Sequence, residues 1–164
     1  MIKIQHTTGA DPRSLVLRED MDAETFALYG DYFDGLTASR RELVDTALHT
    51  EQADLFAVVI AVEDGEDLGH AALRRLATVD DAYGGLEVKK VYVRPAARGR
   101  GLSRLLMTAI EEVARELGEP GIQLQTGPRQ HEAIALYRAL GYADSQPFGP
   151  YRGLDDMVYF AKML

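Results

Sequence analysis

Apolar residues recur with the two-residue period of strands in some segments of the chain and with the period of helices in others. Alternating or continuous apolar runs predict strands over residues 2–6, 55–62, 68–76, 87–93, 122–126, 142–147 and 156–163. Helical spacing predicts helices around residues 13–30, 38–50, 101–117 and 130–140. Because no linker divides these elements, we expect one α/β (α+β) domain over residues 1–164, with a mixed sheet flanked by helices.

Two of the expected helices carry an identifiable apolar face. The helix over residues 101–117 has one apolar stripe, formed by Leu102, Leu105, Leu106, Ala109, Ile110, Val113 and Leu117. Gly118 and Pro120 are expected to end it. The helix around residues 13–30 is expected to turn Leu17, Met21 and Leu28 inward.

The strand over residues 87–93 is irregular. Val88, Val91 and Val93 are spaced by three residues and then by two, although alternate residues share a face in a regular strand. One extra residue, a β-bulge near Lys89 and Lys90, would place all three valines on the core side. A bulge also leaves backbone groups unpaired by the neighbouring strand.

A Gly-rich turn follows this strand and opens the helix over residues 101–117. Gly99 and Gly101 let the backbone approach a bound group closely, and the helix N-terminus adds partial positive charge, so the segment predicts an anion site. It is no dinucleotide fingerprint, because Arg104 stands where the third glycine belongs, and no P-loop, because Leu102 follows Gly101. The alternative is a solvated basic turn.

The turn resembles the coenzyme-A loop of the GNAT superfamily of N-acetyltransferases, whose pattern is read here as Arg98, Gly101 and Ser103. Residues 124–142 resemble the second signature of that family, a strand, a loop and a helix closed by a Gly-Tyr pair. Gln130 stands where many members carry Asn. The two signatures cover residues 87–142 in the expected order.

The resemblance implies a GNAT-type fold, in which the strands over residues 87–93 and 122–126 splay apart and acetyl-CoA lies between them. The backbone of Val91 and Val93 would then hold the pantetheine arm, and an amide of that strand would polarise the thioester carbonyl. The remaining residues implied to bind the co-substrate are Arg98, Gly99, Arg100, Gly101, Leu102, Ser103 and Gln130.

Acetyl transfer to an amine needs a base, because an alkylammonium group has a pKa of about 10.4. Glu87 begins the strand implied to bind the co-substrate, at a position where some family members carry a catalytic glutamate. The alternative is a strand-edge glutamate paired with Lys89 or Lys90. Tyr137 matches the tyrosine that usually serves the family as general acid; without the resemblance, a tyrosine on an apolar helix face is a core residue.

Composition narrows the classes of partner. The net charge of −8 argues against non-specific nucleic-acid binding, and the 46% of apolar residues include no run long enough to span a membrane. The chain lacks cysteine and its four histidines have no ligand spacing, so we expect no metal. The start of the chain shows no signal-peptide pattern, so cytoplasmic residence is expected.

The sequence therefore predicts an N-acetyltransferase that moves acetyl from acetyl-CoA directly to a primary amine of a small molecule or peptide. Direct transfer is favoured because no cysteine can form an acyl-thioester intermediate. Two alternatives stay open, a non-catalytic acyl-CoA-binding or sensory domain and a transferase that uses a longer acyl-CoA. A homodimer is also left open, and the sequence does not identify the amine.

Overall fold

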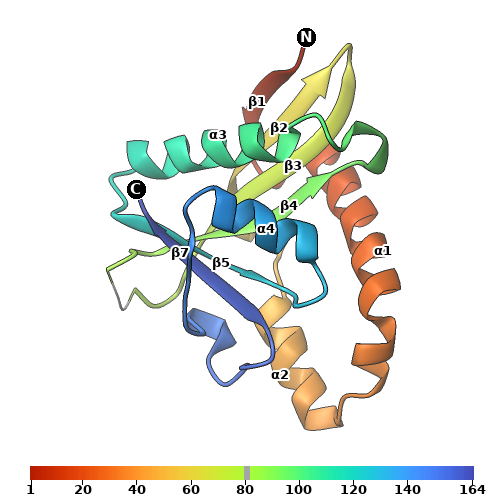
Figure 1. Ribbon diagram of the computed structural model, residues 1–164, viewed down its shortest axis with the longest axis vertical. Coiled ribbons are helices and arrows are strands. Elements are labelled where there is room, and N and C mark those ends of the chain that lie inside the picture. Colours follow the sequence, from red (N-terminus) through yellow and green to blue (C-terminus); the bar gives the residue numbers. More distant parts are fainter. Residues whose placement is uncertain (80–81) are drawn as a thin grey trace.

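The computed structural model describes residues 1–79 and 82–164. Its centre is a seven-stranded sheet in the order β1-β2-β3-β4-β5-β7-β6 (Figure 1). All neighbouring strands are antiparallel except β4 and β5, which confirms a mixed, mostly antiparallel sheet. The strands are β1 (Lys3–Thr7), β2 (Leu55–Glu63), β3 (Glu66–Arg75), β4 (Leu86–Val93), β5 (Gly121–Thr126), β6 (Ala143–Asp144) and β7 (Val158–Met163).

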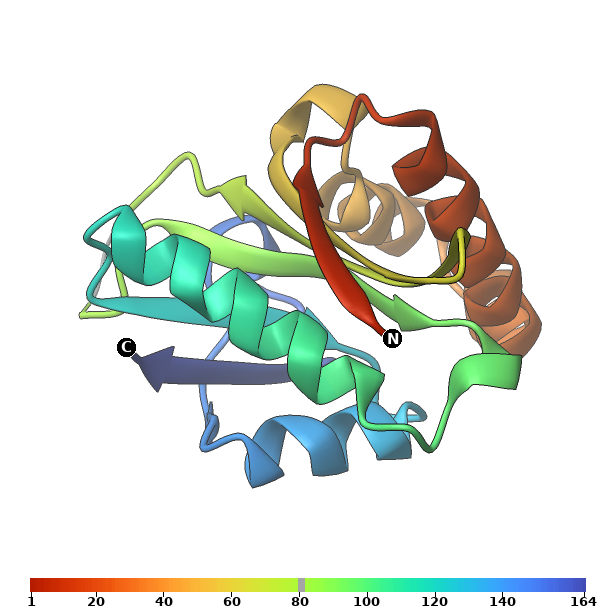
Figure 2. The ribbon, with the colours of Figure 1, turned by 90° about the horizontal axis from the view of Figure 1, so that it is seen from above.

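Helices cover both faces of this sheet (Figure 2). On one side lie α1 (Pro12–Asp34) and α2 (Ala38–Leu48), and on the other lie α3 (Leu102–Glu116) and α4 (His131–Ala139). Alternation along β2 serves both layers, because Val59 and Ala61 pack in the core that contains α3, and Val58 and Ile60 pack against Leu17 of α1. Three short 3₁₀ helices lie at Gln52–Asp54, Pro95–Ala97 and Gly149–Tyr151.

Several predicted details need correction. The expected strand over residues 142–147 is paired only at Ala143–Asp144, and Pro147 has no N–H to extend the ladder. The first helix runs on to Asp34. Leu28, Leu105 and Leu117 were expected on inner faces but are 42%, 45% and 46% exposed. The sequence also predicts a turn over residues 80–85, and part of that range lies outside the described residues.

The bulge expected in β4 is confirmed. His70 pairs with Tyr92 and Ala72 with Lys89, so β4 advances by three residues over a span in which β3 advances by two. Lys90 takes up the extra residue with a φ of 56°, in the left-handed region. Val88 and Val93 are consequently buried in the α3-side core, and Val91 packs against the same core, as the spacing of the valines predicts.

The splay of the central strands is also present. Pairing between β4 and β5 covers only Glu87 with Gln123 and Val88 with Leu124. Beyond Val88 the two strands separate, so the edge of β4 that carries Val91 and Val93 faces a gap rather than a neighbouring strand.

Candidate active site

Two cavities meet where β4 and β5 separate. The first, of about 630 Å³, lies over the Gly-rich turn and the start of α3, and the second, of about 500 Å³, lies between β4, β5, α1 and α2. Both volumes are typical of small-molecule sites. Seven residues line both cavities: Met21, Thr25, Val91, Arg129, Gln130, Ala133 and Tyr137. A molecule in one cavity can therefore touch a molecule in the other at this boundary.

The Gly-rich turn forms one end of the first cavity. Gly99 and Gly101 line it with φ values of 76° and 78°, in the region that favours glycine. Leu102 and Ser103 begin α3 there, no side chain caps the helix, and among the described residues their N–H groups have no acceptor. The turn thus presents free donors to the cavity, which suits an anion.

The arginines of the turn are already engaged. Arg98 lines the first cavity, but its guanidinium lies 2.6 Å from the Glu24 carboxylate and also donates to the Val93 carbonyl. Arg100 pairs with Glu63 at 2.6 Å and is not among the residues lining the cavity. Arg104, which sequence reasoning used only to exclude a motif, does line it. Arg104 lies one helical turn after Gly101, and this spacing in the sequence could have indicated that it lines the anion site.

Tyr137 occupies the boundary between the cavities. Its side chain is 5% exposed, and burial raises the pKa of the phenol above its ordinary value. Among the described residues its hydroxyl has no hydrogen-bond partner. A neutral phenol that lines both cavities and has its proton uncommitted can donate to a group bound there.

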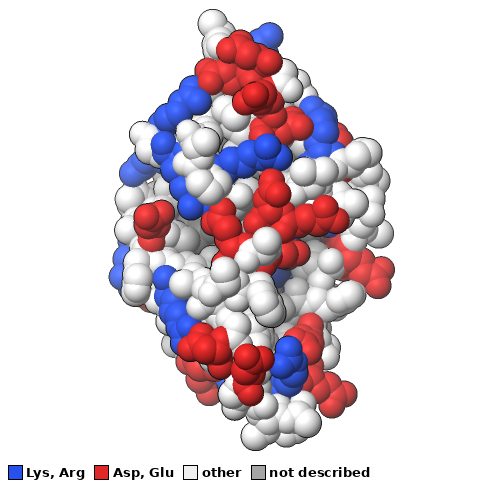
Figure 3. All heavy atoms as spheres, turned by 90° about the vertical axis from the view of Figure 1, so that its right-hand side faces the viewer, with Lys and Arg blue, Asp and Glu red and all other residues white. Residues whose placement is uncertain are grey.

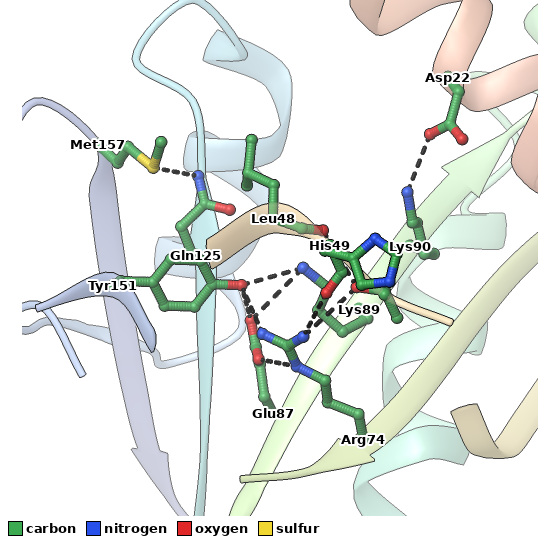
Figure 4. A network of polar contacts seen from close by, with 11 residues as sticks. Asp22, Leu48, His49, Arg74, Glu87, Lys89, Lys90, Gln125, Tyr151 and Met157 are labelled. Atoms are coloured by element: carbon green, nitrogen blue, oxygen red, sulfur yellow. Dashed lines mark hydrogen bonds and ion pairs between the residues drawn. The ribbon is translucent and has the colours of Figure 1, made fainter. Parts of the chain in front are cut away.

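Glu87 is fully buried in a polar cluster beside the second cavity and lines neither cavity. Its carboxylate accepts a 2.6 Å hydrogen bond from Arg74 Nε and a second, close one from the Tyr151 hydroxyl (Figure 4). The principal partner is therefore Arg74, opposite on β3, rather than the lysines weighed from the sequence. Sequence reasoning missed Arg74 because a cross-strand pair depends on register.

Lys89 connects this cluster to the second cavity, which it lines. Its Nζ atom donates to the Tyr151 hydroxyl at 3.0 Å and lies 3.8 Å from Glu87 (Figure 4). Burial lowers the pKa of Lys89 to about 8. The sequence marked Lys89 as part of a bulge and as an alternative partner of Glu87, but not as a residue of the cavity.

His70 holds the bulge in place. Its Nδ1 atom lies 2.8 Å from the Lys90 carbonyl and must donate, so Nε2 of the neutral ring accepts from the Ser14 hydroxyl at 2.8 Å. Burial lowers the pKa of His70 from 6.5 to about 4. The sequence places His70 in a predicted strand, which favours a structural role, and this geometry agrees with that interpretation.

The shift predicts acid sensitivity. The folded-state pKa of His70 lies below the unfolded value. The contribution of the neutral His70 ring to the free energy of unfolding is therefore fully present above pH 6.5 and is lost as the pH falls toward 4. The free energy of unfolding falls by about 3 kcal/mol over this range. Urea unfolding measured at several pH values across this range should show the free energy of unfolding falling with pH in the wild type. In His70→Gln it should fall less steeply. The exposed His6 supplies the control, and an equal slope in His70→Gln and His6→Gln would contradict the assignment.

The described residues contain no group of three or more His, Asp or Glu side chains placed to hold a metal ion. None of the helices in that part of the chain combines the length and apolar character needed to cross a bilayer.

Comparison with known proteins decides the family. The sequence model described as the acetyltransferase (GNAT) family matches residues 17–142. The chain belongs to that family. The match contains β2 to α4, and hence the Gly-rich turn, the bulged strand and Tyr137.

Related sequences include two GNAT-like relatives with named activities. The chain is 40% identical over 102 residues to an IAA acetyltransferase from Azospirillum brasilense, which covers 62% of this chain and 63% of that protein. It is 31% identical over 109 residues to streptothricin acetyltransferase from Streptomyces lavendulae, covering 66% and 52%. The matches thus span less than two thirds of these relatives.

A solved structure extends the GNAT likeness to the whole chain. A candidate acyl-CoA N-acyltransferase from Klebsiella pneumoniae superimposes with a TM-score of 0.73 and 26% identity, over 100% of this chain and 98% of that one. An acetyltransferase from Streptococcus agalactiae superimposes with a TM-score of 0.68 and 20% identity, which shows the shared fold. The cytoplasmic location stays a prediction, and the homodimer stays open.

Proposed function

We propose that this GNAT protein is an N-acetyltransferase that moves acetyl from acetyl-CoA directly to a primary amine of a small molecule or peptide. The observation that carries the proposal is the meeting of two cavities at one uncommitted phenol, Tyr137. Direct transfer between two bound substrates needs such a shared boundary, because the reacting atoms must come within about 3–3.5 Å of each other.

We assign acetyl-CoA to the first cavity. The free N–H groups of Leu102 and Ser103, with the backbone at Gly99 and Gly101, would receive the pyrophosphate. The open edge of β4 at Val91 and Val93 would bond the pantetheine arm, since no strand pairs with it there. In this proposal Arg98 exchanges Glu24 for a phosphate, whereas Arg100 contributes only long-range charge.

Gln130 is assigned a contact through its amide nitrogen. Its amide oxygen already accepts from the Gly127 N–H at 2.9 Å and from the Thr126 hydroxyl at 3.1 Å. The NH₂ group is left to donate toward the cavities that Gln130 lines.

The second cavity is assigned to the amine. The face that carries α1 gathers acidic side chains across its middle (Figure 3), and α1 supplies Glu24 to the first cavity and Asp22 to the second. With the net charge of −8, this face attracts a cationic amine from solution. The same field opposes an anionic co-substrate, so acetyl-CoA binding depends on the donors of the turn.

The chemistry requires one proton to leave the ammonium group before attack. Glu87 is the proposed acceptor, and because neither Glu87 nor its partner Tyr151 lines a cavity, the proton must reach Glu87 through water. The amine then forms the C–N bond as the C–S bond breaks, and a β4 N–H stabilises the oxyanion. Tyr137 donates its proton to the departing thiolate and recovers one from the transferred nitrogen.

The test is turnover with purified protein and acetyl-CoA against a panel of amines, polyamines, amino acids and peptides, with release of coenzyme A thiol as the measurement. At least one amine should give saturable thiol release and an acetylated product by mass spectrometry. Tight acetyl-CoA binding without thiol release from any member would contradict transfer and favour a sensory domain. Faster release from a longer acyl-CoA would correct the donor.

Gly101→Val should sharply weaken acetyl-CoA binding in calorimetry, because a branched side chain would project where the co-substrate meets the backbone. A Cβ at Gly101 would meet no other atom, but valine is strained at a φ of 78°, so the stability of the variant is measured beside its affinity. Gly118→Val is the matched control, since Gly118 has a φ of 76° and open space but lies at the other end of α3. Equal affinity in the two variants would refute the assignment of the turn.

A further inference from the structure

Within residues 1–79 and 82–164, the charged side chains that line the second cavity each have a close partner of opposite charge, with one exception. Lys90 meets Asp22 at 2.9 Å, Arg129 meets Asp31 at 2.7 Å, and Asp156 meets Arg40 at 2.6 Å. The exception is Lys89, whose nearest carboxylate is 3.8 Å away.

That carboxylate, on Glu87, does not neutralise Lys89. It is bound at 2.6 Å by Arg74, which carries a permanent charge, so the cluster of Arg74, Glu87 and Lys89 holds one positive charge in excess when Lys89 is protonated. Tyr151 lies between them as an acceptor from Lys89 and a donor to Glu87, and adds no charge. A buried cation that shares its counterion with an arginine is costly, and Lys89 is only 8% exposed.

Lys89 nevertheless stays able to carry charge at neutral pH. Its pKa of about 8 leaves most molecules protonated at pH 7. In the part of the chain that the structure describes, one of its three N–H donors is used, by Tyr151, so two are left for a group in the cavity that Lys89 lines. An anion placed there would balance the positive charge that Glu87, shared with Arg74, leaves over.

We propose that Lys89 binds a carboxylate of the acceptor, and that the acceptor is an apolar α-amino acid acetylated on its amine. This deepens the proposed function and rests on it. The rest of the cavity suits an apolar side group, since its lining includes Met21, Tyr29, Phe33, Leu48 and Met157. A carboxylate on Lys89 and an apolar side group among these residues are compatible with one small ligand.

The positions of Lys89 and Val91 favour an amino acid. The two residues flank the bulge at Lys90 and both line the second cavity, and Val91 lies at the boundary where the amine must meet the acetyl group. One small ligand in contact with both residues would carry an amine and a carboxylate together. An α-amino acid meets this condition, whereas a polyamine lacks the carboxylate.

The experiment compares acceptors that differ only in the carboxylate: phenylalanine with phenethylamine, and leucine with isopentylamine. In the wild type, kcat/KM for each amino acid should exceed that of its decarboxylated partner by about tenfold to a hundredfold, the range for a hydrogen bond to a charged group. Lys89→Met, of similar size, should remove this preference by lowering only the amino-acid values. Lys3→Met, on an exposed lysine of β1, should keep it.

Two results would overturn the inference. One is equal kcat/KM for the two members of each pair in the wild type. The other is a Lys89→Met variant that loses activity equally with both members, because this would make Lys89 a base or a structural cation instead. Acetyl-CoA affinity measured in the same variants shows that the fold has survived.

A readout that needs no turnover separates this inference from the proposed function. Calorimetry compares N-acetylphenylalanine with N-(2-phenylethyl)acetamide on the protein saturated with coenzyme A. If the wild type binds the carboxylate ligand more tightly and Lys89→Met does not, the carboxylate site is supported. This holds even if no thiol release is found, a result that would contradict only the proposed acetyl transfer. Equal affinities overturn the site even if some other amine is acetylated.

Discussion

Tyr137→Phe is expected to lower kcat by about tenfold to a thousandfold while leaving acetyl-CoA affinity nearly unchanged. The ring stays in place and only the hydroxyl is lost, so the contribution removed is the proton or hydrogen bond given to the departing sulfur. Because that hydroxyl has no partner among the described residues, its removal breaks no hydrogen bond, and the free energy of unfolding should not fall. Thiol release and urea unfolding measure the two effects.

Tyr142→Phe is the matched control for this experiment. Tyr142 is a buried tyrosine whose ring lies 5.8 Å from that of Tyr137, but it lines neither cavity and its hydroxyl donates to Glu111 at 2.9 Å. Its loss should cost about 1–3 kcal/mol of stability and leave kcat unchanged. Equal kcat values in the two variants would make Tyr137 a packing residue.

Glu87→Gln is expected to affect stability and rate together. The variant keeps the shape of the side chain but leaves the buried Arg74 without its carboxylate, and breaking a buried ion pair costs about 3–5 kcal/mol. If Glu87 accepts the proton of the amine, kcat also falls. The rising limb of the pH–rate profile then shifts to higher pH and reports only the titration of the amine itself. Acetyl-CoA affinity should stay as in the wild type.

Glu111→Gln separates the two effects. Glu111 is a buried glutamate held by Lys162 at 2.8 Å and Arg115 at 3.3 Å, and it lines neither cavity. Its replacement should lower the stability without moving the pH–rate profile. If Glu87→Gln, assayed well below its melting temperature, shows the profile of Glu111→Gln, Glu87 is only the counterion of Arg74 and the base must be sought elsewhere, first at Tyr151.

Local patterns in the sequence determined most of the fold. Strand and helix periods are properties of neighbouring residues, so the elements were predicted with errors mainly at their ends. The spacing of Val88, Val91 and Val93 even located the bulge, because only one extra residue could bury all three. The predicted length of β6 was too great, because the length of a strand depends on how many of its residues pair with the neighbouring strand, here β7.

The Gly-rich turn and Tyr137 were also accessible to the sequence, because each belongs to a motif within one strand, turn and helix. The surroundings of Glu87 were not. Arg74 reaches it through the β3–β4 register, and Tyr151 comes from a 3₁₀ helix that is 64 residues further along the chain. Burial and charge balance are sums over such distant neighbours. For this reason, only the tertiary structure decided that Glu87 is paired and that Lys89 faces the second cavity without a counterion of its own.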